Sequence, residues 1–256
     1  MAKPFNEWTV LPHGKLTRLE PNLACVTGVM RMPPMGDVER RMTVVRLFDG
    51  RLVIYSAIAL DEPQMRELES FGIPSFLIVP SDIHRMDAKI WKDRYPKMAV
   101  VAPAGAREKA EEIVPVDASF VDFGDPAVHF QSVAGTGERE ASLIVTSDDA
   151  TTLVLNDVIF NLANRTGISG WLFKAIGLTG DEPHIAPPVR MRQVKDKTAL
   201  RAQLLAWSRL PNLKRIIIAH GDIIATDASA TLRRIANDLG SGGTGARPDA
   251  DTLPSS

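Results

Sequence analysis

The stretch Ser75-Phe-Leu-Ile-Val-Pro-Ser-Asp-Ile-His-Arg-Met-Asp87 joins a run of apolar residues to a loop that carries two carboxylates and an imidazole. A short apolar run that stops at a proline is typical of a buried strand. Ligands of α/β proteins collect at the ends of such strands. We therefore take Asp82, His84 and Asp87 as candidate site residues.

Two later strands are expected to end in the same way. The run 151–155 is followed by Asp157, and the run 215–219 is followed by His220. Taken singly, each Asp is more typical of a helix cap, and His84 or His220 of an ordinary hydrogen-bonded histidine at a surface edge. Three polar strand ends in one chain favour a common site.

The rest of the chain shows the pattern of a layered α/β protein. β-Branched runs are concentrated before residue 60 and between 127 and 155, and helical segments punctuate the remainder. This order predicts two facing sheets with helices outside, an αββα sandwich. We expect strands at 41–47, 52–59, 75–79, 98–101, 127–133, 141–145, 151–155 and 215–219, and helices at 61–72, 104–113, 197–210 and 227–239.

Composition limits the partners and the compartment. The 256 residues carry 30 Lys and Arg against 31 Asp and Glu, which gives a net charge of −1. This near-neutral charge argues against binding to nucleic acid or to an anionic membrane through the overall electrostatic field of the protein. Cys25 is the only cysteine, so no intramolecular disulfide can form. With no leader-like start and no long apolar run, we expect a cytoplasmic protein. Residues 1–239 are expected to form one domain and 240–256 a disordered tail.

The order of these motifs resembles the metallo-β-lactamase fold superfamily over roughly residues 14–239. The closest resemblance is to a divergent branch of uncharacterised DUF4336-like proteins with eroded metal motifs. The superfamily's first motif is His-x-His-x-Asp-His, and a later Gly-His supplies another ligand. An Asp after a strand bridges two metals, and a final His completes the second site. The resemblance implies a four-layer αββα fold and a metal-dependent hydrolase.

The first motif matches in part. With His84 as the second histidine, Asp82 takes the place of the first histidine, Met86 that of the aspartate and Asp87 that of the closing histidine. Met86 is a poor replacement, because a neutral thioether suits soft copper rather than zinc, manganese or iron.

The later positions match better. Asp157 corresponds to the bridging aspartate and His220 to the final histidine. Thr136 stands where the Gly-His histidine is expected, and the segment 55–58 lacks the aspartate usual after the second hairpin strand. Asp157 and His220 are therefore the best matches to the superfamily's ligands, whereas the histidine of the Gly-His motif is lost at Thr136.

The surviving residues imply at most one ion. A first site would comprise Asp82, His84 and Asp157, and a second would comprise Asp87, Asp157 and His220, so neither is complete. A single divalent ion, zinc first and iron or manganese next, could be held by His84, Asp157, His220 and one of Asp82 or Asp87. Water activated by it would attack an ester, amide or phosphoester of a small molecule, with Asp82 or Asp87 as catalytic base.

The alternative is a metal-free member of the fold that serves as a binding or assembly module, and a homo-oligomer is compatible with either hypothesis. Glu138 and Glu140, near the missing histidine, could contribute a carboxylate, but we interpret them as solvated loop charges. The irregular segment 165–190 contains Trp171-Leu-Phe173, which we expect in a core or at an interface.

Overall fold

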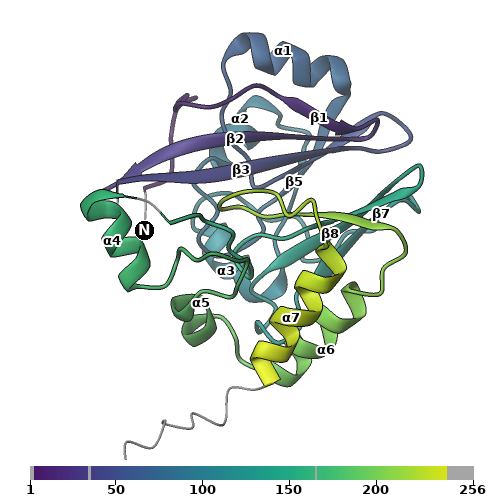
Figure 1. Ribbon diagram of the computed structural model, residues 1–256. Helices are drawn as coiled ribbons and strands as arrows, with labels where there is room; N and C mark the ends of the chain where they lie inside the picture. The colour runs from purple at the N-terminus through teal and green to yellow at the C-terminus, as the bar shows by residue number, and fades with distance from the viewer. Residues whose placement is uncertain (1–2, 34–35, 165, 241–256) are drawn as a thin grey trace, which may run out of the picture.

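The computed structural model describes residues 3–33, 36–164 and 166–240, and within them ten strands form two sheets (Figure 1). The six-stranded sheet has the order β1-β2-β3-β4-β5-β6, and the four-stranded sheet has the order β10-β9-β8-β7. The strands are β1 (Thr17–Glu20), β2 (Leu23–Met32), β3 (Gly36–Arg46), β4 (Arg51–Tyr55), β5 (Ile73–Ile78), β6 (Ala99–Val101), β7 (Val128–Ser132), β8 (Ala141–Ser147), β9 (Ala150–Val154) and β10 (Leu213–Ile217).

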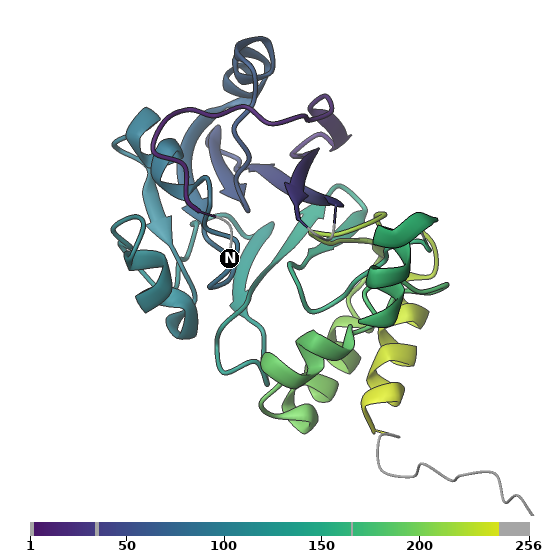
Figure 2. The same cartoon turned by 90° about the vertical axis from the view of Figure 1, so that its left-hand side faces the viewer.

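Helices cover the outer faces of the two sheets (Figure 2). A central core, which includes Val53 and Leu143, lies between the sheets, while separate cores lie beneath α1–α3 and beneath α6–α7. The predicted αββα sandwich is confirmed. The helices are α1 (Glu62–Phe71), α2 (Ala88–Arg94), α3 (Ala104–Glu111), α4 (Gly167–Ala175), α5 (Pro187–Arg192), α6 (Lys197–Trp207) and α7 (Ala228–Gly240).

Local capping signals explain two of the helices that the sequence predicts, α1 and α6. Asp61 accepts a hydrogen bond from the backbone N–H of Gln64, and a proline occupies the first turn of α1. Asp196 caps α6 in the same way through Thr198 and Ala199. These caps satisfy N–H groups that have no partner within the helix.

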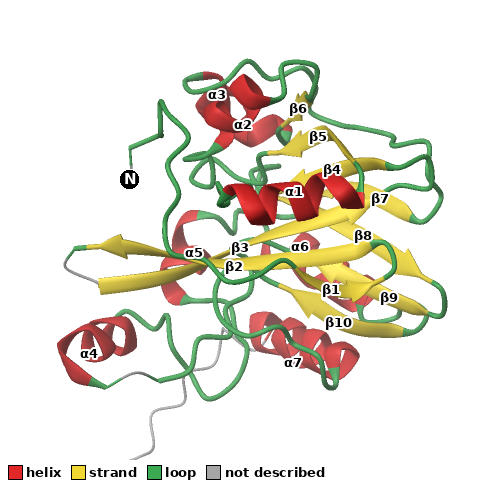
Figure 3. Ribbon diagram, turned by 90° about the horizontal axis from the view of Figure 1, so that it is seen from above, coloured by secondary structure: helices red, strands yellow, loops and turns green. Residues whose placement is uncertain are grey.

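The sequence-based prediction missed the first hairpin and three helices. β2 and β3 pair in antiparallel register over ten residue pairs, from Leu23↔Val45 to Met32↔Gly36. The hairpin extends past the sheet toward α4 and α5 (Figure 3). α2 was missed, and α4 and α5 lie in the segment predicted to be irregular. Phe173 is buried there beside Val38, whereas Trp171 is exposed.

Strand direction places the site. β4, β5 and β6 run parallel to one another in one sheet, and β9 and β10 run parallel in the other. Parallel strands end at the same edge, so the residues that follow them lie close together. Gly240 closes α7, and the rest of the predicted tail, 241–256, lies outside the described residues. Among the described helices, none has the length and apolarity to span a bilayer.

Candidate metal centre

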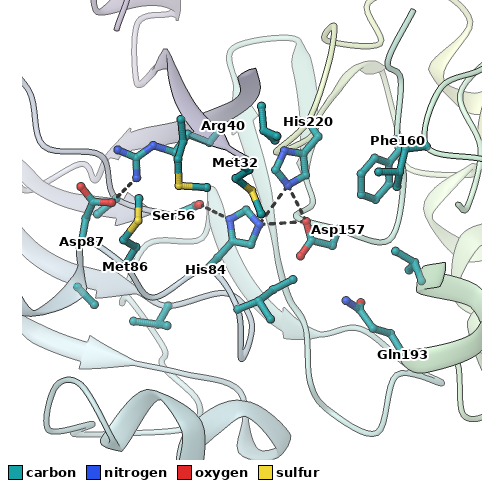
Figure 4. A pocket seen from close by; sticks show the side chains of 18 of the residues that line it. Met32, Arg40, Ser56, His84, Met86, Asp87, Asp157, Phe160, Gln193 and His220 are labelled. Atoms are coloured by element: carbon teal, nitrogen blue, oxygen red, sulfur yellow. Dashed lines mark hydrogen bonds and ion pairs between the residues drawn. The ribbon is translucent and has the colours of Figure 1, made fainter. Parts of the chain in front are cut away.

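The segments that follow four parallel strands, β4, β5, β9 and β10, each contribute one polar side chain to the same cluster. Ser56 follows β4 and His84 lies in the loop after β5, while Asp157 and His220 follow β9 and β10 of the other sheet. Figure 4 shows these four side chains in sequence from Ser56 through His84 to Asp157 and His220. The structure therefore brings together His84, Asp157 and His220, three of the five predicted metal ligands.

The three potential ligand atoms form a small triangle. Asp157 Oδ1 lies 3.1 Å from His84 Nε2 and 3.2 Å from His220 Nε2, and the two Nε2 atoms are 3.2 Å apart. In a tetrahedral zinc site with bonds of about 2.0–2.1 Å, neighbouring ligand atoms are about 3.3 Å apart. The spacing of the triangle matches that arrangement.

His220 is fixed by groups on β3 and on the chain around Asn161. Its Nδ1–H donates to the carbonyl oxygen of Glu39 at 2.5 Å, and the ring of Phe160 stacks on it with centroids 5.3 Å apart. A carbonyl can only accept, so Nδ1 carries the proton and Nε2 of the neutral ring keeps its lone pair. Gly221 has φ +94°, and a Cβ there would lie 2.1 Å from the carbonyl oxygen of Asn161, which explains the glycine.

Arg41 holds the same loop from the other side. Its buried guanidinium donates to the carbonyl oxygens of Ile218 at 2.6 Å and Gly221 at 2.7 Å. These two carbonyls flank His220, so Arg41 sets where the loop after β10 runs. Arg41 thus helps to orient His220 through the backbone of this loop, while Glu39 of the same strand contacts the ring directly.

His84 is oriented by Ser56, whose Oγ lies 3.1 Å from its Nδ1. The serine hydroxyl can accept the Nδ1 proton, which leaves Nε2 with a lone pair that faces Asp157. Ser56 has a positive φ of 56°, an uncommon conformation for a serine that places its side chain at the turn after β4. It occupies the segment 55–58 that lacks the superfamily's aspartate.

Asp157 is buried and close to two rings that favour its anion when they are protonated. Burial alone would raise the pKa of this carboxyl, but His84 and His220 lower it below its usual value. Burial likewise opposes protonation of His220, and Asp157 raises the pKa of that ring above its usual value. Oδ1 accepts no well-aligned hydrogen bond despite its close neighbours, and Oδ2 has no partner among the described residues.

This arrangement fits a cation. Two imidazole lone pairs and a carboxylate oxygen converge with their remaining polar atoms buried or held elsewhere. Such a set repels itself unless a proton or a metal ion lies between its members. Imidazole and carboxylate are the donors that zinc, iron and manganese accept.

Glu140 is buried, so its interpretation as a solvated loop charge is wrong, whereas Glu138 is exposed as expected. Glu140 Oε1 accepts from the backbone N–H groups of Asn156 at 3.2 Å and Val158 at 3.0 Å, on either side of Asp157. Burial, and then the charge of Asp157, raises the pKa of Glu140 well above its usual value.

The other candidates stay outside the triangle. Asp87 pairs with buried Arg40 and accepts from the backbone N–H of Ala59 at 3.0 Å, and burial raises its pKa against the effect of Arg40. Asp82 does not belong to the group of converging ligand atoms among the described residues. Thr136 donates to the carbonyl oxygen of its neighbour Val133 at 2.7 Å.

Comparisons with known proteins agree on the fold. The sequence matches no protein-family model and no curated protein sequence. Its structure is similar to the metallo-β-lactamase FIM-1 from Pseudomonas aeruginosa in the mono-zinc form, at 12% identity over 90% of this chain and 96% of that one, with a TM-score of 0.59. A metallo-β-lactamase from Hirschia baltica gives 12% identity, 88% and 98% coverage and a TM-score of 0.57. The structure of VMB-1 is similar at 13% identity over 91% of this chain and 100% of that one, with a TM-score of 0.61.

The fold and the converging side chains define an α/β protein of the metallo-β-lactamase fold with a candidate metal centre in its described part. At this level of identity the likeness concerns the fold. What the centre does is argued from its own residues.

Proposed function

We propose that the protein is a metal-dependent hydrolase with a mononuclear centre held by His84, Asp157 and His220. The observation that carries the proposal is the triangle of Nε2, Nε2 and Oδ1 atoms, each pair 3.1–3.2 Å apart. Zinc is the first candidate, and a structural neighbour was solved in a mono-zinc form. A divalent cation there supplies Lewis-acid polarisation of a carbonyl or phosphoryl oxygen and activates water at neutral pH.

Side-chain and backbone groups of the protein would orient the ligands and the attacking water. Ser56 and the carbonyl of Glu39 keep the two rings turned so that both Nε2 atoms face inward. Asp157 Oδ2, which has no hydrogen-bond partner among the described residues, can accept a hydrogen bond from an attacking water and so orient it. The lowered pKa of Asp157 makes this carboxylate a weak base, and Asp87, proposed from the sequence as a base, is engaged by Arg40.

The proposal extends to the substrate class, the cellular location and the family branch of the protein. A small-molecule substrate and a cytoplasmic location agree with the net charge of −1, which offers no general attraction to nucleic acid or anionic lipid. We also propose membership of the DUF4336-like branch, since Met86 and Thr136 stand at ligand positions of the superfamily motifs. A homo-oligomer is compatible with all of this.

Metal analysis tests the proposal most directly. Protein purified without chelator, or dialysed against zinc, should hold close to one equivalent of metal. His84→Ala and His220→Ala should each abolish tight binding, whereas His129→Ala, which changes an exposed histidine of β7, should not. A protein that binds no zinc, iron or manganese, or that binds equally well without His84 and His220, would favour the metal-free binding module instead.

A further inference from the structure

A pocket of about 370 Å³ opens beside His84, Asp157 and His220, and most of its lining is apolar. The β2–β3 hairpin supplies one wall through Met30, Met32 and Val38. The volume lies in the range of small-molecule sites. Figure 4 shows Met32 among the side chains that line the pocket together with the two histidines.

The segment that contains α4 and α5 supplies the other wall, through Phe173, Leu178 and Val189. These side chains join Val38 of the hairpin in one apolar cluster. The segment that looked irregular in the sequence therefore shapes the space in front of the candidate metal centre.

The pocket offers little to a charged ligand away from the centre. Arg40 and Asp87 both line it as an ion pair, so their charges offset each other, although Arg40 Nε and Nη2 have no hydrogen-bond partner among the described residues. Ser56 and Gln193 are polar without being charged, and Arg192 lines the pocket at a solvent-exposed position. A charged group buried among the apolar side chains, away from the two arginines, would lose its hydration without gaining a partner, which is strongly unfavourable.

We propose that this pocket binds the apolar acyl chain of a neutral ester or amide whose carbonyl group lies against the centre. The identity of the reacting group rests on the proposed function, whereas the preference for an uncharged chain rests on the lining. Methionines 30, 32 and 86 are flexible and polarisable, so the walls can adapt to chains of different shape. In hydrolysis of an ester, water forms the new carbon–oxygen bond, the bond to the alcohol breaks, and the alcohol leaves with a proton.

Binding can be measured without any reaction by using straight-chain methyl ketones from butanone to decanone. They carry the carbonyl and the chain but cannot be hydrolysed. Calorimetry on the chelator-treated full-length protein should show Kd falling about three- to fourfold for each added methylene until the pocket is full. Octanoate should bind at least about tenfold more weakly than octanone, because its carboxylate would lose hydration in a pocket where Asp87 already neutralises the charge of Arg40.

Two positions on α5 provide matched variants. Val189→Trp fills the pocket and should remove the dependence on chain length, whereas Met191→Trp, at an exposed position of the same helix, should not. Val189→Ala should instead shift the optimum to longer ketones, which keeps the test valid if the tryptophan variant does not fold. Equal Kd values for all ketones, tighter binding of octanoate, or no effect of either Val189 variant would overturn the assignment.

Hydrolysis of p-nitrophenyl esters from acetate to decanoate by the zinc-loaded protein separates this inference from the proposed function. Chain-length-dependent ketone binding without hydrolysis would support the pocket assignment and count against the hydrolase. Hydrolysis at a rate independent of the acyl chain, with no ketone binding, would support the hydrolase and overturn the pocket assignment.

Discussion

The Nε2 atoms of His84 and His220 lie 3.2 Å apart although 136 positions separate the two residues in the sequence. They follow strands of different sheets, so their meeting depends on how the sheets pack. The shared core between the sheets fixes that packing, through residues such as Tyr55 and Ile217 next to the strand ends. The candidate metal centre is thus a product of the tertiary structure rather than of any one motif.

Ser56→Ala should lower zinc affinity by about tenfold to a hundredfold, because the His84 ring loses the hydroxyl that holds its Nδ1. Zinc titration against a competing chelator measures the change. Ser56→Gly should weaken binding similarly while it relieves the positive φ, which separates the hydroxyl from backbone strain. Ser70→Ala in α1 is the control, and unchanged affinity in both Ser56 variants would contradict the role.

Glu140→Ala should destabilise the fold by about 2–4 kcal/mol, because the backbone N–H groups of Asn156 and Val158 are left buried without an acceptor. Glu140→Gln keeps an acceptor oxygen and should cost less than about 1 kcal/mol. Urea unfolding gives both values. If glutamine proves as costly as alanine, then the charge of Glu140 and not its hydrogen bonds supports the loop. Glu138→Gln, at an exposed position, serves as the control.

Asp87→Ala should destabilise the protein by about 3 kcal/mol, since Arg40 is left buried without its carboxylate. Adding Arg40→Met should recover most of this loss, because the isolated charge is then gone. Both variants should retain zinc with affinity close to wild type in equilibrium dialysis. Loss of zinc from the folded double variant would show that Asp87 is a ligand after all, as its position in the first motif suggested.

The link between Glu20 and β10 should give a stability difference that depends on pH. Lys214 and, against the opposing effect of burial, Arg215 lower the pKa of Glu20, whose Oε1 lies 2.9 and 2.7 Å from their side-chain nitrogens. A carboxyl group whose pKa is lowered by folding stabilises the protein at pH values above its unfolded-state pKa, about 4.3. This stabilisation is lost as the pH falls through the folded-state pKa.

Glu20→Gln should therefore cost about 1 kcal/mol at neutral pH, and this difference should shrink as pH falls below the unfolded value. Thermal or urea unfolding of both proteins across that range measures it. Glu108→Gln, an exposed position of α3, should show a small difference at all pH values. A difference for Glu20→Gln that stays constant in acid would contradict the ion pair.

The sequence predicted the layers and the ligand triangle because both depend on strands. His84, Asp157 and His220 each come soon after an apolar run, and parallel strands bring such positions to one edge. It could not place Asp82 and Asp87, because the path of the loop after β5 depends on contacts such as that between Asp87 and Arg40, which are remote in sequence.

Ser56 and Glu140 were missed for different reasons. A positive φ at a serine leaves no trace in composition or periodicity, although the missing aspartate in the segment 55–58 pointed to that position. Glu140 comes at the end of a polar turn, and only the approach of the loop around Asp157 buries it. The extent of β2 was missed because its partner strand was expected to begin at Arg41 rather than Gly36.

Three consecutive residues of β3 support the candidate centre and its surroundings: Glu39 holds His220 by its carbonyl, Arg40 holds Asp87 beside the centre, and Arg41 holds the loop after β10. Side chains alternate along a strand, so sliding β3 past β2 by one residue would exchange the faces of Arg40 and Arg41. A single insertion or deletion in this part of β3 would thereby dismantle the centre even if both sheets still formed. Among natural variants of this chain, length changes should accordingly be found in other segments than residues 39–41.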